Sequence, residues 1–480
     1  MAQANSLPTE VVDTSRPADA GPRATFTGSI RLRLRTPAKM RNLEMVLLGF
    51  ACLINLASIT LVQLGTMGRI DSNIITLGLG LGVLVFLMHF TMRLVARDAD
   101  PFILPIITVL NGTGIAMIYR LDIAEKTTGW SSDGIRQIVW TAIAIILAIV
   151  VIVVIRNHRV LQRYRFIAMF AGIVLLLLPM LPAPIGQTIN GAKLWVSFGF
   201  FSFQPGELAK IALAIFFAGY LVSARDSLSM VGTKILGITF PRARDLGPIL
   251  VVFVASMVVL VFQRDLGTSL LYFGLFLVMI YVATGRSSWI ILGLGLFLGG
   301  AFAASRVLTY VSGRIGAWLD PFSTANLEAT TNSSYQLVQG LFGLGHGGLI
   351  GTGLGQGRPQ LTPLAESDYI VAALGEELGL VGLFAILALY LLFISRGFRI
   401  GFAGQDDFGR LLGVGLAFVI GLQVFIVIGG VTRVIPLTGL TTPFLAAGGS
   451  SLVANWIIAA LLLRLSDTIR NHPRLVVDNE

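Results

Sequence analysis

The chain has 480 residues, of which 55% are hydrophobic and only 12% are charged. Soluble domains carry about 25% charged residues, so this composition excludes a water-soluble protein and indicates one that crosses a membrane many times. The net charge of +10 therefore does not indicate nucleic-acid binding, and we expect membrane lipids as the surroundings. The single cysteine, Cys52, excludes an intrachain disulfide.

Residues 1–43 are polar, contain four prolines and end in a basic cluster. Such a segment cannot bury enough apolar surface to fold, and basic residues beside a first span keep that side of the protein in the cytoplasm. The sequence therefore predicts a disordered basic cytoplasmic tail over 1–43.

Twelve apolar runs are long enough to cross a bilayer. They are 44–66, 73–90, 102–119, 136–155, 166–182, 205–223, 247–263, 266–284, 288–305, 368–395, 411–430 and 449–465. The weakest boundary is the charged step 263–265 between the seventh and eighth runs. We expect an all-α polytopic membrane protein with about twelve transmembrane helices.

Lysine and arginine are concentrated in the N-terminal tail and in every second connection between the runs. Because cytoplasmic loops carry the excess of positive charge, both termini are predicted to be cytoplasmic, including a tail over 467–480. This orientation places the connections 183–204, 306–365 and 431–448 together on the outer face.

The outer loop 306–365 is the most informative connection, because spans need only short turns between them. It is long, polar and rich in glycine, and such loops commonly carry function. The glycines do not form a nucleotide-binding loop, because no Gly-Lys-Ser/Thr sequence closes them. Its candidate acids are Asp320, for which turn initiation is the simpler role, and Glu328.

Two ionisable residues, Glu207 and Lys210, lie inside the sixth predicted span and are three positions apart, so they share a helix face. A charge in the bilayer costs about 2.5–3.5 kcal/mol even on lenient scales. The two residues therefore form either a buried pair that fixes helix packing or the wall of a polar cavity.

Three further polar positions stand next to or inside spans. Asp265 could cap the helix that follows it, and Arg264 beside it could equally meet an anionic head group. Glu376 and Glu377 are consecutive, and because neighbouring helical residues point about 100° apart they cannot both face one cavity. Arg433 opens the 431–448 segment, which reads as irregular backbone that needs protein or a water-filled cavity around it.

Several motifs, in this order, resemble those of the SEDS family (shape, elongation, division and sporulation), which includes the RodA, FtsW and SpoVE proteins. They are Gly-Ala-Lys-x-Trp at 191–195, Phe-Gln-Pro-x-Glu-Leu-Ala-Lys at 203–210, Gln-x-Asp-Leu-Gly-Thr at 263–268, Gly-Gly-Leu-x-Gly-x-Gly-Leu-Gly at 347–355, Gly-Glu-Glu-Leu-Gly at 375–379, Pro-Leu-Thr-Gly at 436–439 and Gly-Gly-Ser-Ser at 448–451. The resemblance implies a ten-helix core over 102–466. The helices within 44–90 are then two additions, a layout closest to the RodA-type members of actinobacteria.

The resemblance further implies a peptidoglycan glycosyltransferase that polymerises lipid II, with inversion, at the outer face of the cytoplasmic membrane during elongation or division. A class B penicillin-binding protein is the implied partner. No cofactor is specified, although a divalent cation could assist the leaving pyrophosphate. The implied substrate-binding positions are Lys193, Trp195, Gln204, Glu207, Lys210, Asp265, Asp368, Glu376, Glu377 and Arg433.

One departure concerns the family's proposed catalytic aspartate, whose position falls near Ser323 or Thr324 in this chain. Three hypotheses follow. Glu328 replaces the aspartate, or another acid such as Asp320 or Asp368 serves, or polymerase activity is weakened and the chain is a scaffold that activates the penicillin-binding protein. The rival of another class is a lipid II transporter or flippase, in which buried charges line a path through the bilayer.

Overall fold

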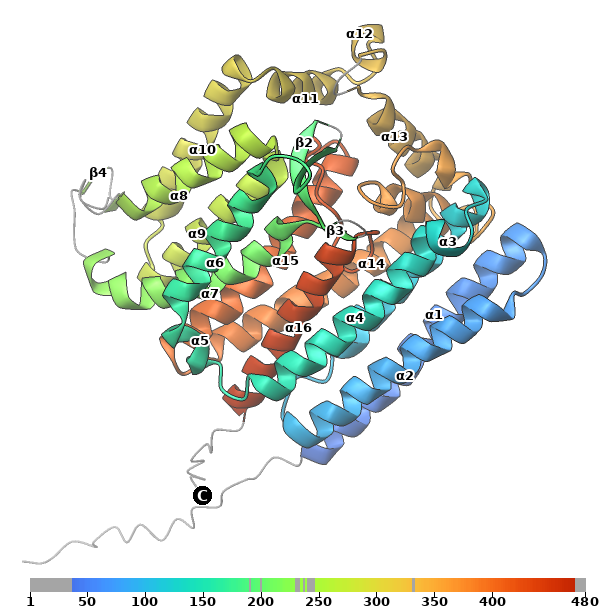
Figure 1. Ribbon diagram of the computed structural model, residues 1–480, viewed down its shortest axis with the longest axis horizontal. Helices are drawn as coiled ribbons and strands as arrows, with labels where there is room; N and C mark the ends of the chain where they lie inside the picture. Colours follow the sequence, from blue (N-terminus) through green and yellow to red (C-terminus); the bar gives the residue numbers. More distant parts are fainter. Residues whose placement is uncertain are drawn as a thin grey trace, which may run out of the picture. The chain divides into compact units, whose positions relative to one another are not determined.

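The computed structural model describes residues 37–189, 191–198, 201–228, 234–235, 238–239, 247–329 and 333–470. Within these residues, ten helices are long and apolar enough to cross a membrane (Figure 1). They are α1 (Pro37–Met67), α2 (Ser72–Val95), α3 (Ile103–Glu125), α4 (Asp133–Val154), α7 (Pro205–Leu228), α9 (Leu266–Thr284), α10 (Ser288–Val307), α14 (Ile370–Phe402), α15 (Asp407–Val431) and α16 (Gly449–Arg470). The multi-span helical class predicted from composition is confirmed.

Two of the twelve predicted apolar runs form helices that are shorter, in the described chain, than these ten. The run at 166–182 gives α6 (Arg165–Leu177), which passes into a 3-10 turn with Pro179 in its first positions. The run at 247–263 gives α8 (Gly247–Val258) and a π-helical turn (Val259–Gln263). The turn ends where Arg264 takes a positive φ of 57° and the chain begins α9.

The connections that were predicted to lie on the outer face are more ordered than expected. Three strands form an antiparallel sheet in the order β1 (Gly186–Ile189), β2 (Ala192–Phe198), β3 (Phe201–Phe203). The sequence did not predict these strands, because the alternation in each is too short to stand out.

The 306–365 connection is largely helical rather than an open loop, and Figure 1 shows its helices at the same end of the helix bundle as β2. It contains α11 (Thr309–Leu319), α12 (Thr324–Leu327), α13 (Tyr335–Gly347) and a 3-10 turn at Pro359–Leu361. In α13 the apolar side chains of Leu337 and Val338 are buried, as in an amphipathic helix.

The first helix begins at Pro37, earlier than the predicted boundary at 44, and Arg41 near its start is buried beside Glu44. Arg41 Nη1 lies 2.6 Å from Glu44 Oε2, and His89 Nδ1 on α2 lies 2.7 Å from Glu44 Oε1. Helix α1 packs on α3, and α2 packs on α4. Residues 1–36 of the predicted tail lie outside the described residues. At the other end of the chain, α16 continues to Arg470, past the predicted end of the core at residue 466.

The 432–448 segment is irregular, as its sequence indicated, and its residues 442–446 are buried. Buried carbonyls need partners, and here four spanning helices supply them from side chains. Asn111 Nδ2 donates to Phe444 O at 3.2 Å, Gln137 Nε2 to Ala446 O at 3.0 Å, Gln423 Nε2 to Thr441 O at 2.9 Å, and the Tyr390 hydroxyl to Pro443 O.

Candidate functional site

Lys210 on α7 is held by three neighbours and is only 1% exposed. Its Nζ donates to Glu207 Oε2 at 2.6 Å, to Gln423 Oε1 on α15 at 3.0 Å and to Asn455 Oδ1 on α16 at 2.9 Å. An ammonium group has three N–H donors, so every one is used. This geometry favours a buried pair that fixes the packing of three helices.

Replacing Lys210 with methionine should lower stability by about 3–5 kcal/mol, because the Glu207 carboxylate would remain buried without its cation. The measurement is the unfolding free energy of the purified protein in detergent. The double variant Glu207→Gln/Lys210→Met should recover part of the loss. Lys193→Met, on the exposed face of β2, is the control and should be neutral; an equal loss in that variant would contradict the assignment.

Glu376 and Glu377 near the start of α14 bind different backbone N–H groups at the end of the glycine-rich segment, in keeping with their 100° offset. Glu376 Oε1 accepts the Arg358 N–H at 2.8 Å. Glu377 Oε2 accepts the Gly355 N–H at 2.8 Å, while Arg120 Nε on α3 donates to Glu377 Oε1 at 3.0 Å. The two acids therefore anchor the 347–357 glycine segment to the helix bundle.

Gly351 makes this close approach possible. Its φ is +88°, and an ideal Cβ there would lie 2.3 Å from the carbonyl oxygen of Glu377. Gly351→Ala should therefore destabilise the protein strongly, whereas Gly345→Ala in α13, where nothing lies within 4 Å, should be tolerated or slightly stabilising. Thermal unfolding of both variants checks this, and equal midpoints would show that the segment can move aside.

A second group of polar residues meets at the end of the bundle that was predicted to face outward. Arg314 on α11 donates from Nη1 to Leu437 O at 3.0 Å. Gly439 follows with a φ of +80°, and an ideal Cβ there would lie 3.8 Å from both Arg314 Nη2 and Asp368 Oδ2. Because Gly439 has no side chain, the guanidinium and the carboxylate border one small space. We call Arg314, Asp368 and Gly439 the outer cluster.

Asp265 is the N-cap of α9. Its carboxylate accepts the Thr268 N–H at 2.9 Å. Burial raises the pKa of Asp265, and the hydrogen bonds from Thr268 oppose that rise. The capping role that the sequence allowed is therefore present.

The half-buried Asp368 has a carboxyl group whose pKa is raised above its ordinary value. Burial raises the pKa of its carboxyl group to about 6, with the Arg314 guanidinium opposing the rise and the negative charges of Glu366 and Asp265 adding to it. A carboxyl group with such a pKa can accept and release protons near neutral pH, which suits a general base.

An apolar cavity of about 510 Å³ adjoins the outer cluster. This volume lies in the range of ligand sites. Its walls come from α8, α9, α10, α11 and α15, with Phe253, Phe273, Phe297 and Phe425 among them. Arg314 and Thr438 also line it, so one cation belongs both to the cavity and to the outer cluster.

Other predicted positions lie on exposed segments. Asp320 is exposed after α11, and Glu328 is exposed after α12. Arg433 has a φ of +60°. Its guanidinium lies at the carboxyl end of α11, where Nε donates to Trp318 O at 2.9 Å and Nη2 donates to Leu319 O at 2.7 Å. These contacts cap a helix end, where positive charge is favourable.

The motif residues before α7 lie in and beside the sheet. Lys193 is exposed on β2 and Trp195 is half-buried on the same strand, paired with Gln187 of β1. The Gln204 N–H donates to Ser450 Oγ at 2.9 Å, which ties β3 to the start of α16.

The sequence reasoning missed Arg314 and Arg120. Arg314 was missed because 306–365 was taken as a loop. The spacing of Val311, Ile315 and Trp318 is helical and would have placed Arg314 beside an apolar stripe. For Arg120, no local signal pairs it with Glu377, a residue far along the chain.

The profile of the FtsW, RodA and SpoVE family, described as "Cell cycle protein", matches residues 101–471. The chain therefore belongs to this family, the SEDS proteins. Among curated relatives, the peptidoglycan glycosyltransferase RodA of Mycobacterium tuberculosis H37Rv is 44% identical over 90% of this chain and 93% of its own length. The probable peptidoglycan glycosyltransferase FtsW of Geobacter metallireducens is 32% identical over 80% of this chain and 100% of its own.

Two solved structures share the fold. One is the crystal structure of an aspartate-to-alanine mutant of the rod shape determining protein RodA from Thermus thermophilus, with 25% identity and a TM-score of 0.53 over 78% of this chain and 99% of that one. The other comes from work on the structural coordination of polymerization and crosslinking by a peptidoglycan synthase complex. It has a TM-score of 0.59 and 24% identity, with the same coverage.

Proposed function

We propose that this chain is a peptidoglycan glycosyltransferase of the RodA type, which polymerises lipid II into glycan strands at the outer face of the cytoplasmic membrane. Both termini are then cytoplasmic, in agreement with the distribution of lysine and arginine. The observation that carries the proposal is the position of Arg314, which borders both the 510 Å³ apolar cavity and the space beside Asp368.

Lipid II is a disaccharide-peptide joined through a pyrophosphate to a long polyprenyl chain. Its polymerisation needs an apolar groove for the chain, a cation for the leaving pyrophosphate and a base for the attacking hydroxyl. In this proposal the cavity takes the proximal part of the polyprenyl chain and Arg314 faces the pyrophosphate. Asp368 takes the proton as the hydroxyl oxygen bonds to the anomeric carbon, and the bond from that carbon to the pyrophosphate breaks with inversion.

Asp368 is our preferred base because it combines partial burial, a pKa near 6 and a nearby cation. Glu328 is the competing acid. Its side chain is exposed beyond α12, so its candidacy rests on the resemblance and on the absence of an aspartate at 323–324. The two acids lie in different segments, and substitution separates their roles.

The alternative of a lipid II transporter receives less support. Lys210, Glu376 and Glu377, which would have to coordinate a passing head group, are buried and are bound to partners within the protein. A head group could use them only after those bonds had broken.

We also propose a transpeptidase of the class B penicillin-binding type as the partner. The support is the family likeness and the solved relative from a synthase complex that coordinates polymerization with crosslinking. If the chain acts only as a scaffold for such a partner, it should activate crosslinking without making glycan strands.

The test is polymerisation of purified lipid II by the full chain in detergent, with and without its cognate penicillin-binding protein. Glycan strands that disappear in Asp368→Asn would establish the enzyme and this base. Loss in Glu328→Gln or Asp320→Asn alone would move the base to that acid. No strands from a well-folded complex would favour the scaffold or the transporter.

A further inference from the structure

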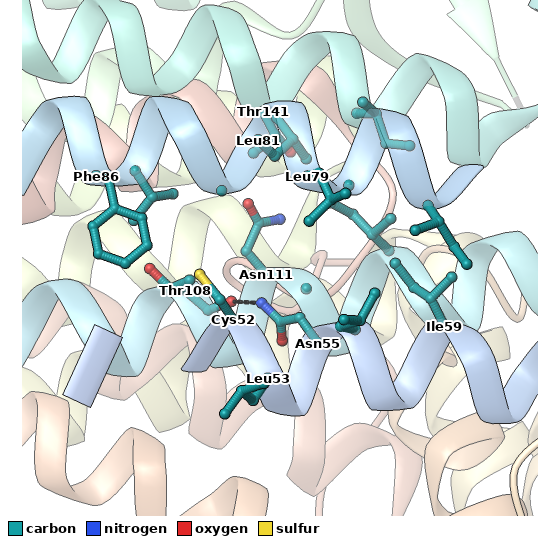
Figure 2. Close-up of a pocket in the computed structure, with 18 of the residues that line it drawn as sticks. Cys52, Leu53, Asn55, Ile59, Leu79, Leu81, Phe86, Thr108, Asn111 and Thr141 are labelled. Atoms are coloured by element: carbon teal, nitrogen blue, oxygen red, sulfur yellow. Dashed lines mark hydrogen bonds between the residues drawn. The ribbon is translucent and has the colours of Figure 1, made fainter. Parts of the chain in front are cut away.

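A second cavity lies between the two N-terminal helices and the rest of the bundle. It has a volume of about 320 Å³ and is lined by α1, α2, α3, α4 and Trp456 of α16. Figure 2 shows its side chains, with Asn55 Nδ2 donating to Thr108 O at 2.9 Å beside Cys52. Helices α1 and α2 precede the residues that the family profile matches.

Glycines create this cavity. Gly78 and Gly82 lie four residues apart on one face of α2 and both line it. Small residues at this spacing usually allow two membrane helices to touch. Here an ideal Cβ on Gly78 comes no nearer than 3.6 Å to any atom outside the local backbone, and one on Gly82 no nearer than 3.9 Å. By contrast, a Cβ on Gly112 of α3 would lie 2.0 Å from Asn55 Cγ.

The walls identify the chemistry of an occupant. Among the described residues that line the cavity none is charged, and leucine, isoleucine and valine are the commonest kind of side chain. Every lining residue belongs to a predicted span, so the medium around the cavity is the hydrocarbon of the bilayer rather than water. An empty apolar space of this size is unfavourable because its lining loses dispersion contacts, and smaller apolar cavities are known to take up apolar ligands.

We propose that this cavity binds one acyl chain of a membrane phospholipid, which fills the seam between α1–α2 and the helices behind them. A phospholipid is favoured over the substrate's polyprenyl chain for two reasons. The cavity offers no cation for a pyrophosphate, and it shares no lining residue with the outer cluster or with the 510 Å³ cavity.

The cavity also lies next to side chains of α3 and α4 that hydrogen-bond to the 432–448 segment. Asn111 lines the cavity and donates its Nδ2 hydrogen bond to Phe444 O of that segment. Thr141 lines it one helical turn from Gln137, which bonds Ala446 O and the Gly448 N–H. The acyl chain therefore packs against Asn111, which holds this irregular backbone in place, and lies one helical turn from Gln137, which does the same.

The experiment uses the full chain in vesicles of phosphatidylethanolamine and phosphatidylglycerol, with a small fraction of phosphatidylcholine that carries a diazirine in the middle of one acyl chain. After irradiation, adducts are mapped by mass spectrometry. Adducts are expected on Ile115 and Ile138, which line the cavity and are only 3% and 6% exposed. Val83, which is 69% exposed, reports ordinary surface lipid in every sample.

The matched variants fill the cavity or leave it open. Gly78→Leu/Gly82→Leu should abolish the adducts on Ile115 and Ile138 and keep the adduct on Val83. Gly80→Leu, on an exposed face of the same helix with nothing within 4 Å of an ideal Cβ, should keep all three. Equal elution and unfolding midpoints for the variants establish that they fold; if the double variant does not, Gly82→Leu alone replaces it.

Two results would overturn the proposal. One is an absence of adducts on Ile115 and Ile138 in the unmodified chain while Val83 is labelled, which would mean that the cavity excludes lipid. The other is displacement of the phospholipid probe by undecaprenyl phosphate at low mole fraction, which would assign the cavity to a polyprenyl chain. Neither readout depends on polymerase activity.

Discussion

Replacing Asp368 with asparagine should lower the rate of lipid II polymerisation by about 10²–10⁴-fold, the usual contribution of a positioned general base. Asparagine keeps the shape of the side chain but cannot accept the proton of the attacking hydroxyl. The rate is measured under single-turnover conditions with purified lipid II, so that product release does not hide the chemical step.

The pH profile gives an independent readout of the same group. Burial raises the pKa of Asp368 to about 6, and the active form of a base is the carboxylate. Activity should therefore be full above that value and fall as the pH decreases through about 6. The residual activity of Asp368→Asn should lack this step, and a step that persists in that variant would assign the titration to another group.

Glu328→Gln is the control for this prediction. Glu328 is exposed, so its substitution should leave folding unchanged and, on our proposal, cost little activity. A loss in Glu328→Gln comparable to that of Asp368→Asn would show that the exposed segment closes over the substrate and supplies the base.

Replacing Arg314 with glutamine should lower the turnover number by about 10²–10³-fold, as does removal of one group that stabilises developing negative charge. The positive charge matters most as the pyrophosphate leaves, so the effect should fall on the turnover number more than on KM. Arg314→Lys should recover only part of the rate, because an ammonium group cannot reproduce the planar fork of a guanidinium.

Arg433→Gln is the matched comparison, since Arg433 is also an outer-face arginine predicted to face the substrate. Its guanidinium caps the end of α11 through Trp318 O and Leu319 O, so we expect a smaller effect. A larger loss of turnover in Arg433→Gln than in Arg314→Gln, with equal unfolding midpoints, would reverse the assignment of the pyrophosphate cation.

Local sequence was sufficient for the class of protein and for much of its layout. In lipid, a long apolar run can hydrogen-bond its backbone N–H and C=O groups only by forming a helix. The spans could therefore be predicted without a structure. The offset of Glu376 and Glu377 and the capping role open to Asp265 also followed from helix geometry alone. Two of the predicted runs give shorter helices in the described chain, one followed by the 3-10 turn that contains Pro179 and one by the π-helical turn before Arg264.

The tertiary structure decided what each polar residue contacts, because contact partners lie far apart in the chain. Lys210 reads as a pair with Glu207 in sequence, and only folding adds Gln423 and Asn455 and uses every donor of the ammonium group. The outer cluster is similar: Arg314, Asp368 and Gly439 come from three segments, and no periodicity connects them. Sequence thus determined that this chain spans a membrane as helices, since the bilayer leaves the backbone few choices, whereas side-chain partnership depended on which helices pack together.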